Sequence, residues 1–234
     1  GFGLIESNAD GQGVAYAGSG AVVAPAKRYE CILSEAQLHS WLNKIMQAEL
    51  VCVDTETTGL DSMTAQLVGI SIAIEAHHAA YLPLAHRYPG APLQISHEHA
   101  LQILKPWLES AAHKKLGQNL KYDQHIFANH GINLAGIAED TLLQSYVLES
   151  HRTHNMDDLA LRHLGVKTIS YEEVAGKGAK QIGFDQVEID KATQYSAEDA
   201  DITLQLHQTL LPQIRAQGKL EHVYRDIEMP ARQV

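Results

Sequence analysis

The apolar run Leu50–Val53, followed at once by the D-T-E segment that carries Asp54 and Glu56, constrains the fold more than any other part of the sequence. A continuous aliphatic run is typical of a strand that is covered on both faces of a sheet. Alternate residues of a strand share a face, so Asp54 and Glu56 can reach one cation together. Two carboxylates held that close repel each other unless a cation neutralises them. The sequence therefore predicts a strand that ends in a divalent metal site, with a solvated acidic turn as the simpler alternative.

Two later segments carry acids that can join this pair. The segment Asn119–Asp123 (NLKYD) opens a predicted helix, and a longer predicted helix begins with Tyr195 and reaches Asp199 one turn later. Residues four apart on a helix share a face, so the Tyr195 hydroxyl and the Asp199 carboxylate can address the same ligand. The alternative explanation, an acid favoured by the dipole at a helix N-terminus, fits Glu198 or Asp201 better.

The apolar pattern predicts strands and helices in a definite order. Strands are predicted over 50–54, 67–75 and 79–84, as a three-strand meander, and a short strand near Leu116. Helices are predicted over 35–47, 96–110, 119–127, 140–148, 156–164, 171–174 and 195–211. Pro106 predicts a kink or break in the second helix, and Ser170 with Glu173 forms a capping box. Strands first and helices afterwards favour an α/β fold with a mixed β-sheet flanked by helices.

Composition excludes several classes of protein. The 234 residues can bury one sizeable core, and no apolar run of about 18 residues occurs that would span a membrane. The formal net charge is −10, so nucleic acid would have to bind locally rather than along a broad basic surface. The cysteines are only Cys31 and Cys52, which fits a reducing cytoplasm. Fourteen histidines occur without H-E-x-x-H or paired C-x-x-C spacing, so we expect most of them at the surface rather than in a zinc site.

The first 28 residues differ in composition from the rest of the chain. They are rich in Gly, Ala and Ser and show little periodicity, which predicts a flexible linker over residues 1–28. The sequence starts on Gly rather than Met, so we expect it to be an excerpt of a longer protein.

Four ordered motifs together resemble one known family. They are VDTET at 53–57, GQNLKYD at 117–123, YEEVAGKG at 171–178 and EDADITLQLH at 198–207. In this order they resemble the proofreading 3′-to-5′ exonuclease domain of bacterial DNA polymerase I, which belongs to a superfamily with four catalytic acids and a tyrosine. The resemblance covers about residues 29 to 230 and implies a ribonuclease H-like three-layer fold. It places an exonuclease domain at 29–222 and the start of a truncated polymerase domain at 223–234.

The resemblance also implies a metal site and a mechanism. The implied metal ligands are Asp54, Glu56, Asp123 and Asp199. Carboxylate oxygens select hard cations, so two Mg²⁺ or Mn²⁺ ions are expected, clamping the attacking and leaving oxygens of the reaction. By resemblance, Asp54 bridges the two ions, Glu56 and Asp199 complete the tighter site, and Asp123 serves the second ion partly through water. Tyr195 would help Glu56 orient the attacking water through a hydrogen bond, since a tyrosine with pKa near about 10 is a poor base at neutral pH.

Substrate contacts follow from the same resemblance. Leu60 is the implied wedge against the terminal base, and Tyr171 is the implied stacking partner where the family has Phe. The arginine that the family carries just before its H-x-M-D segment is Thr153 here, and Arg152, one position earlier, is the candidate for that phosphate contact. The residues implied to line the nucleic-acid strand are Gln118, Asn119 and Tyr122.

The expected function is metal-dependent 3′-to-5′ exonuclease activity that releases nucleoside 5′-monophosphates from single-stranded or frayed DNA 3′ ends, without polymerase activity in this chain. We expect a monomer in the bacterial cytoplasm, near the nucleoid, joined to a polymerase domain and not bound to a membrane. One alternative is a ribonuclease D-like RNA exonuclease, against which the YEEVAGKG segment and the IEMP segment at 227–230 argue. Another alternative is a catalytically silent domain that binds DNA ends or serves as a scaffold, against which the four intact acids argue.

Overall fold

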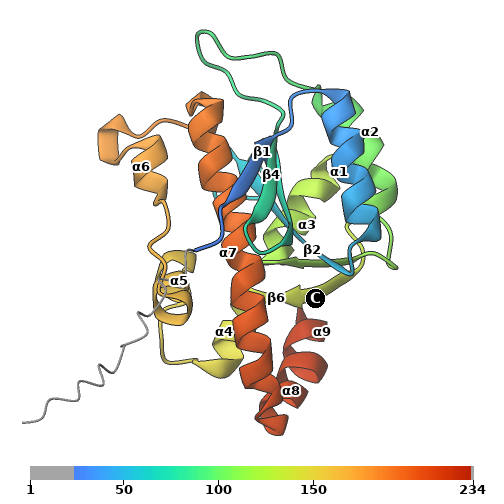
Figure 1. Ribbon diagram of the computed structural model, residues 1–234, viewed down its shortest axis with the longest axis vertical. Helices are drawn as coiled ribbons and strands as arrows, with labels where there is room; N and C mark the ends of the chain where they lie inside the picture. The colour runs from blue at the N-terminus through green and yellow to red at the C-terminus, as the bar shows by residue number, and fades with distance from the viewer. Residues whose placement is uncertain (1–23, 233–234) are drawn as a thin grey trace, which may run out of the picture.

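A six-stranded mixed β-sheet with helices on both faces makes up the body of the protein in a computed structural model, which describes residues 24–232 (Figure 1). The strands are β1 (Arg28–Cys31), β2 (Leu50–Thr57), β3 (Leu67–Glu75), β4 (His78–Pro83), β5 (Lys114–Gly117) and β6 (Ile137–Asp140). Their order across the sheet is β1-β4-β3-β2-β5-β6. Strands β2, β3 and β4 form the predicted antiparallel meander, and β1, β5 and β6 each run parallel to their neighbours. This arrangement confirms the predicted α/β fold.

The helices fall close to the predicted segments. They are α1 (Glu35–Gln47), α2 (His97–Leu108), α3 (Leu120–Asn129), α4 (Thr141–Leu148), α5 (Met156–Leu164), α6 (Tyr171–Ala175), α7 (Ile189–Arg215), α8 (Gly218–His222) and α9 (Met229–Ala231). Single turns η1 (Gly178–Lys180) and η2 (Phe184–Gln186) precede α7, and the π-helical segment η3 (Val223–Glu228) follows α8. The predicted capping box of Ser170 and Glu173 is present and starts α6.

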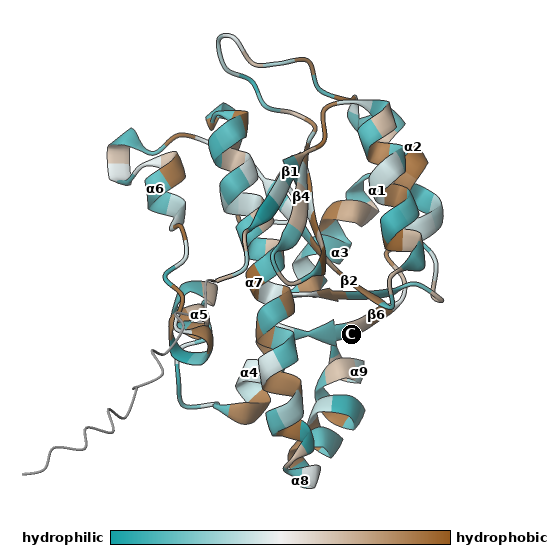
Figure 2. Ribbon diagram, in the orientation of Figure 1, coloured by the Kyte–Doolittle hydropathy of each residue, from teal (hydrophilic) through white to brown (hydrophobic). Residues whose placement is uncertain are grey.

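Strand β2 lies in the sheet between two helical layers, and the alternation of its side chains decides which residues face α7. Val51 and Val53 belong to the large apolar core under α1 and α2, whereas Cys52 packs against Ala197 of α7 on the opposite face. Figure 1 shows α7 crossing the sheet on the side away from α1 and α2. Figure 2 shows these helices banded in brown and teal, as expected for elements that bury only one side. Because alternate residues share a face, Asp54 and Glu56 point toward α7.

Helix α7 begins at Ile189, so the prediction that it starts at Tyr195 was wrong. Its first turns bury small residues such as Ala192 and Ser196, which let the helix approach the sheet but produce no obvious apolar stripe in the sequence. Glu198 and Asp201 are therefore buried in mid-helix rather than at its N-terminus.

Both of these mid-helix acids bind the N-terminal part of the fold. The Glu198 carboxylate accepts from Lys27 Nζ at 3.0 Å, and Asp201 accepts from the Tyr29 hydroxyl at 2.5 Å and from the backbone N–H of His77 at 2.8 Å. Since Tyr29 lies in β1 and Lys27 just before it, the two acids fasten the edge of the sheet to α7.

Three further predictions need correction. Strand β2 runs past its predicted end at Asp54 to Thr57, so both acids lie within the strand. Strands β1 and β6 were not predicted, because each has four residues of mixed polarity and gives no clear period. Helix α2 continues through Pro106 to Leu108, because Trp107 and Leu108 on its last turn are buried in the core. Among the described histidines, those that are buried are His78, His86 and His207.

The predicted domain boundaries are only partly within reach of the structure. Residues 1–23 of the predicted linker lie outside the described residues, 24–27 form neither helix nor strand, and Arg28 already belongs to β1. At the other end, Tyr224 is buried against Leu211 and Ile214 of α7. The boundary after residue 222 remains a prediction. No helix within 24–232 combines the length and apolarity needed to cross a lipid bilayer.

Candidate active site

The structure brings together three of the four predicted acids. Asp54 and Glu56 from β2 and Asp199 from α7 each offer an oxygen, and these oxygens all lie within 4.8 Å of one another. Glu56 is buried, whereas the two aspartates remain partly accessible to solvent. Across residues 24–232, this is the only group of three or more His, Cys, Asp or Glu side chains that close together. We call these three residues the acid cluster.

Burial and mutual repulsion make the acid cluster unfavourable as free anions. Burial, followed by the charge of Asp199, raises the pKa of Asp54 to about 8. Burial and the charges of Asp54 and Asp199 also hold the pKa of Glu56 well above its ordinary value. The buried Oε1 atom of Glu56 accepts no hydrogen bond of ordinary geometry from a described residue, although Ser196 lies near enough to lower the pKa of this carboxyl. A divalent cation would remove the repulsion and give this oxygen a partner, so the donor set fits a hard metal ion.

Asp123, the fourth predicted acid, lies next to the acid cluster but is held by a different set of contacts. It is buried in the first turn of α3, and its Oδ1 atom accepts from the Thr55 backbone N–H at 2.9 Å and from the Thr55 hydroxyl at 2.6 Å. Burial, and then the charge of Asp54, raises the pKa of Asp123, while the Thr55 bonds oppose that rise. Asp123 is thus held through Thr55, the residue between Asp54 and Glu56 on β2.

Tyr195 lies on α7 one turn before Asp199, as the spacing predicted. Burial, and then the charge of Asp199, raises the pKa of the Tyr195 hydroxyl, so this group stays protonated at neutral pH and can donate a hydrogen bond. Its ring packs edge-on against Tyr171 at 6.1 Å and is tilted against Phe184 at 5.9 Å.

A hollow of about 480 Å³ opens beside the acid cluster. We call it the main hollow, and it is lined by Thr55, Glu56, Thr57, Thr58, Gly59, Leu60, Tyr122, Tyr171, Gln181 and Tyr195. Leu60 is 98% exposed at its rim, on a loop that the Tyr122 hydroxyl fixes by donating to the Gly59 carbonyl at 2.6 Å. An apolar side chain presented this openly beside buried acids is suited to contact a flat base.

Three residues predicted to bind the substrate lie outside the main hollow. Gln118 donates to the His154 carbonyl at 3.2 Å and accepts from the Thr141 hydroxyl, so it serves the internal packing of α4. Asn119 takes a left-handed conformation just before α3. Arg152 lines a separate, open hollow of about 590 Å³. The structure thus groups Leu60, Tyr122 and Tyr171 with Glu56, but not these three residues.

Two residues that the sequence did not single out lie close to the site. Asp157, in the first turn of α5, is the charge that, after burial, does most to raise the pKa of Asp199, and it accepts from the Thr168 hydroxyl at 2.5 Å. Gln181 lines the main hollow, with its amide donating to the Gly176 carbonyl at 3.2 Å. The M-D-D segment at 156–158 was the only available signal for Asp157, and nothing in the local pattern marks Gln181.

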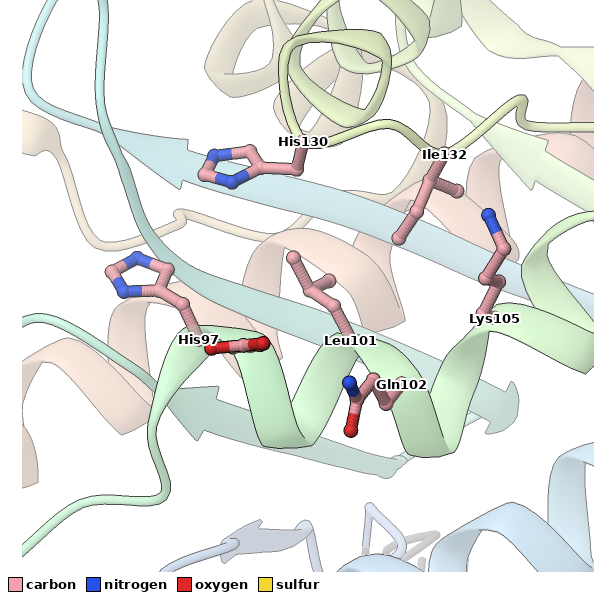
Figure 3. Close-up of a pocket in the computed structure, with 7 residues that line it drawn as sticks. His97, Leu101, Gln102, Lys105, His130 and Ile132 are labelled. Carbon is pink, nitrogen blue, oxygen red and sulfur yellow. The ribbon is translucent and has the colours of Figure 1, made fainter.

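A second hollow of about 340 Å³ lies between α2 and the segment after α3, and contains none of the predicted site residues. Figure 3 shows His97 and His130 at one end of this hollow and Lys105 at the other. The rings of His97 and His130 are stacked, with 5.7 Å between their centroids. His97 is already committed to the Leu67 carbonyl through Nε2, at 2.6 Å. This second hollow therefore has no part in the acid site.

Comparison with known proteins decides the family. The sequence pattern of a family described as 3′-5′ exonuclease matches residues 29–215. The chain belongs to this 3′-5′ exonuclease family. The exonuclease chain is 50% identical over 205 residues to DNA polymerase I of Pseudomonas aeruginosa and 40% identical over 220 residues to DNA polymerase I of Rhizobium leguminosarum. In each case 86% of this chain is covered and the match spans 22% of the relative, so the chain corresponds to about a fifth of these proteins.

Solved structures agree on the fold of the exonuclease chain. A structure described as the POL domain of Pol1 from M. smegmatis in complex with DNA primer-template and dNTP covers 87% of this chain and matches over 30% of its own, with a TM-score of 0.64 and 20% identity. The structure of Escherichia coli RNase D covers 88% of this chain and matches over 51% of its own, with a TM-score of 0.60 and 17% identity. These likenesses confirm the ribonuclease H-like fold predicted from the motifs.

Proposed function

We propose that this chain hydrolyses DNA from the 3′ end, releasing nucleoside 5′-monophosphates, with two Mg²⁺ or Mn²⁺ ions held by its buried acids. One observation carries the proposal: oxygens of Asp54, Glu56 and Asp199 lie within 4.8 Å of one another, and Glu56 also forms part of the wall of the main hollow. Carboxylates raised in pKa by burial, with one unpartnered buried oxygen, form a donor set that a hard cation completes.

The roles that we assign to the acids are those that the family resemblance implies. Asp54, whose pKa is raised by Asp199 and whose charge raises the pKa of Asp123, is the ligand we assign to both ions, with Glu56 and Asp199 completing one site. The pKa of Asp123 is raised by Asp54, and we assign Asp123 to the second ion, partly through water. When bound, the two ions would activate the attacking water and neutralise the charge that develops on the departing 3′ oxygen.

The remaining site residues position the substrate and the water. The Tyr195 hydroxyl, kept protonated by its buried anionic surroundings, donates a hydrogen bond that orients the water together with Glu56. Leu60 and Tyr171 on the rim of the main hollow contact the terminal base from two sides, which tolerates any base because every base has an apolar face. For Gln118, Asn119 and Arg152 the family resemblance alone supports a contact with the strand, farther from the 3′ end.

DNA is the proposed substrate because the relatives with 50% and 40% identity are DNA polymerases. The RNase D structure, at 17% identity, shares the fold and carries no argument about substrate. We further propose that the chain works beside a polymerase domain, in the bacterial cytoplasm, since it matches only 22% of the length of its DNA polymerase I relatives.

A labelled 3′ end tests the proposal. Single-stranded DNA and RNA oligonucleotides of matched sequence are incubated with the chain and Mg²⁺ or Mn²⁺, with and without chelator, and the released nucleotide is identified. We expect 5′-monophosphates from DNA, no release in chelator, and no release by Asp199→Ala or Asp123→Ala variants that keep the wild-type circular dichroism. Chelator-resistant release would refute the metal mechanism. A preference for RNA would point to a ribonuclease D-like enzyme, and binding of DNA ends without hydrolysis in Mn²⁺ would point to a silent scaffold.

A further inference from the structure

His86, which follows β4, is buried and hydrogen-bonded through both ring nitrogens. Nδ1 lies 2.9 Å from the Val187 carbonyl oxygen, and Nε2 lies 2.8 Å from the Tyr81 hydroxyl. A carbonyl oxygen can only accept, so Nδ1 carries the ring hydrogen. Burial lowers the pKa of His86, so the ring is neutral at neutral pH and Nε2 accepts from the Tyr81 hydroxyl. The ring therefore joins β4 to the segment before α7 in a single tautomer.

The segment 86–88 holds the start of α7 at three points. Besides the His86 bond to Val187, the Arg87 backbone N–H donates to the Asp185 carbonyl at 2.6 Å. The backbone N–H of Ile189, the first residue of α7, donates to the Tyr88 hydroxyl at 3.0 Å. Three bonds to five consecutive residues, 185–189, leave the helix start little freedom to shift.

The backbone of His86 is itself fixed on both sides by one side chain. Its N–H donates to Gln94 Oε1 at 2.8 Å, and its carbonyl accepts from Gln94 Nε2 at 2.9 Å. The loop that carries the His86 ring is therefore fixed by the Gln94 side chain.

His86 forms a hydrogen-bonded bridge between Tyr81 and Val187. The Tyr81 end of this bridge lies over the strand residue that pairs with Glu56. Glu56 pairs with Gly69 across β2 and β3, and a Cβ atom at Gly69 would overlap the hydroxyl of Tyr81. Position 69 therefore has to be glycine for Tyr81 to cross β3 and meet His86. The hydrogen bonds of His86 therefore link Tyr81, which lies over the strand partner of Glu56, to Val187, just before the helix that carries Asp199.

Ring contacts carry the position of His86 further, to Tyr195. Phe184 is buried, and its ring lies 5.7 Å from that of His86 and 5.9 Å from that of Tyr195. Protein interiors are close-packed, so a shift of the His86 ring would be passed through Phe184 to the tyrosine beside the acid cluster.

We propose that His86 is a positioning residue of the exonuclease site: by joining the Tyr81 hydroxyl to the Val187 carbonyl, it sets α7 relative to the sheet and so sets Asp199 relative to Asp54 and Glu56. This inference rests on the proposed function for its kinetic consequence. Displacement of a reacting group by about 1 Å can lower a rate on the order of a hundredfold, so the bridge has a measurable effect although it touches no substrate.

Two variants break the bridge in different ways. Tyr81→Phe removes only the hydroxyl that donates to the ring, and His86→Leu removes both hydrogen-bonding nitrogens at similar volume. His86→Gln keeps one N–H donor and one acceptor and should restore part of the bridge. His207→Leu is the matched control. Like His86, His207 is a buried histidine, but it lies on α7 itself, and its Nδ1 is 2.9 Å from Gln144 Nε2, away from the acid cluster.

The measurements are kcat and KM on a 3′-labelled single strand, the calorimetric Mn²⁺ affinity, and the melting temperature. We expect Tyr81→Phe and His86→Leu to lower kcat by about tenfold or more with KM within about twofold, and to weaken Mn²⁺ binding several-fold. His86→Gln should lie nearer to the wild type. His207→Leu should keep the wild-type kcat even where it lowers the melting temperature as much as the other variants.

The outcomes separate this inference from the proposed function. Wild-type kcat and Mn²⁺ affinity in Tyr81→Phe and His86→Leu would overturn the positioning role, and so would an equal loss of kcat in His207→Leu at an equal loss of melting temperature. If the wild type itself releases no nucleotide, the proposed function fails, and the Mn²⁺ titrations of the same variants still decide whether His86 sets the spacing of the acids. If His86→Leu does not fold, Tyr81→Phe decides alone.

Discussion

Replacing Asp54 by Asn should stabilise the metal-free protein while removing its activity. In the folded chain, burial and the charge of Asp199 raise the pKa of Asp54 from 3.8 to about 8. Between about pH 4 and about pH 8 the folded state therefore binds more protons at this carboxyl than the unfolded state does. Stability of the metal-free wild type consequently falls as the pH rises through this window, and an amide at position 54 avoids that loss.

The size of the effect follows from the same pKa. A pH of 7 is about three units above the pKa of this carboxyl in the unfolded chain, and each unit corresponds to about 1.4 kcal/mol. The ionisable carboxyl therefore lowers the free energy of unfolding by up to about 4 kcal/mol. Part of the Asp54 side chain is exposed, and the water that reaches it screens its charge. We therefore expect Asp54→Asn to raise the free energy of unfolding by about half that amount, about 2 kcal/mol, which corresponds to about 4 to 8 °C in melting temperature.

Thermal unfolding in the presence of chelator measures this gap. We expect it to be largest near about pH 8 and to close near about pH 4, where both proteins are uncharged at position 54. Adding Mn²⁺ should stabilise the wild type more than Asp54→Asn, because the variant lacks a ligand. A gap that does not change with pH, or a variant no more stable than the wild type in chelator, would show that burial and the charge of Asp199 do not raise the pKa of Asp54 in the folded protein.

Three other substitutions have distinct expected results. Tyr195→Phe should lower kcat by about a hundredfold or less with KM unchanged, since the hydroxyl positions water without moving a proton, and steady-state kinetics will detect any rise in KM that contradicts this. Leu60→Ala should raise KM for single-stranded DNA by about fivefold through lost apolar contact, and because Leu60 is 98% exposed, its melting temperature should match the wild type. Tyr224→Phe should lower the free energy of unfolding by about 1 to 3 kcal/mol in urea, because Glu139 loses a 2.5 Å hydrogen bond.

Elements with a strong period were predictable to the residue. The bounds of β3, Leu67–Glu75, and of α5, Met156–Leu164, match the prediction because both carry unbroken apolar patterns. The acid pair was predictable in direction as well, since a period of two places Asp54 and Glu56 on one face whatever the sheet around them. The sequence also predicted that Asp199 joins this pair, because the order of the motifs matches that of the family although Asp199 lies far along the chain.

What the sequence could not show depends on contacts between distant segments. The start of α7 was missed because its buried face is made of small residues whose packing value depends on how close the sheet comes. The positions of Arg152 and Gln118 outside the main hollow could not be predicted, because loop paths, unlike strand alternation, follow no period. The burial of His86 was equally invisible, because its partners Tyr81 and Val187 lie 5 and 101 residues away.

The buried hydroxyl of Tyr224 bears on how this fold should be cut for expression. It donates to Glu139 and accepts from the backbone N–H of Asp140 at 3.2 Å, while the Asp140 carboxylate accepts from the backbone N–H of Leu120, the first residue of the helix that carries Asp123. A shortened gene product that stops at residue 215, where the family match ends, discards this tyrosine and loosens the support beneath Asp123, which we propose as a ligand of the second metal ion. The smallest dependable recombinant version therefore has to extend past Tyr224.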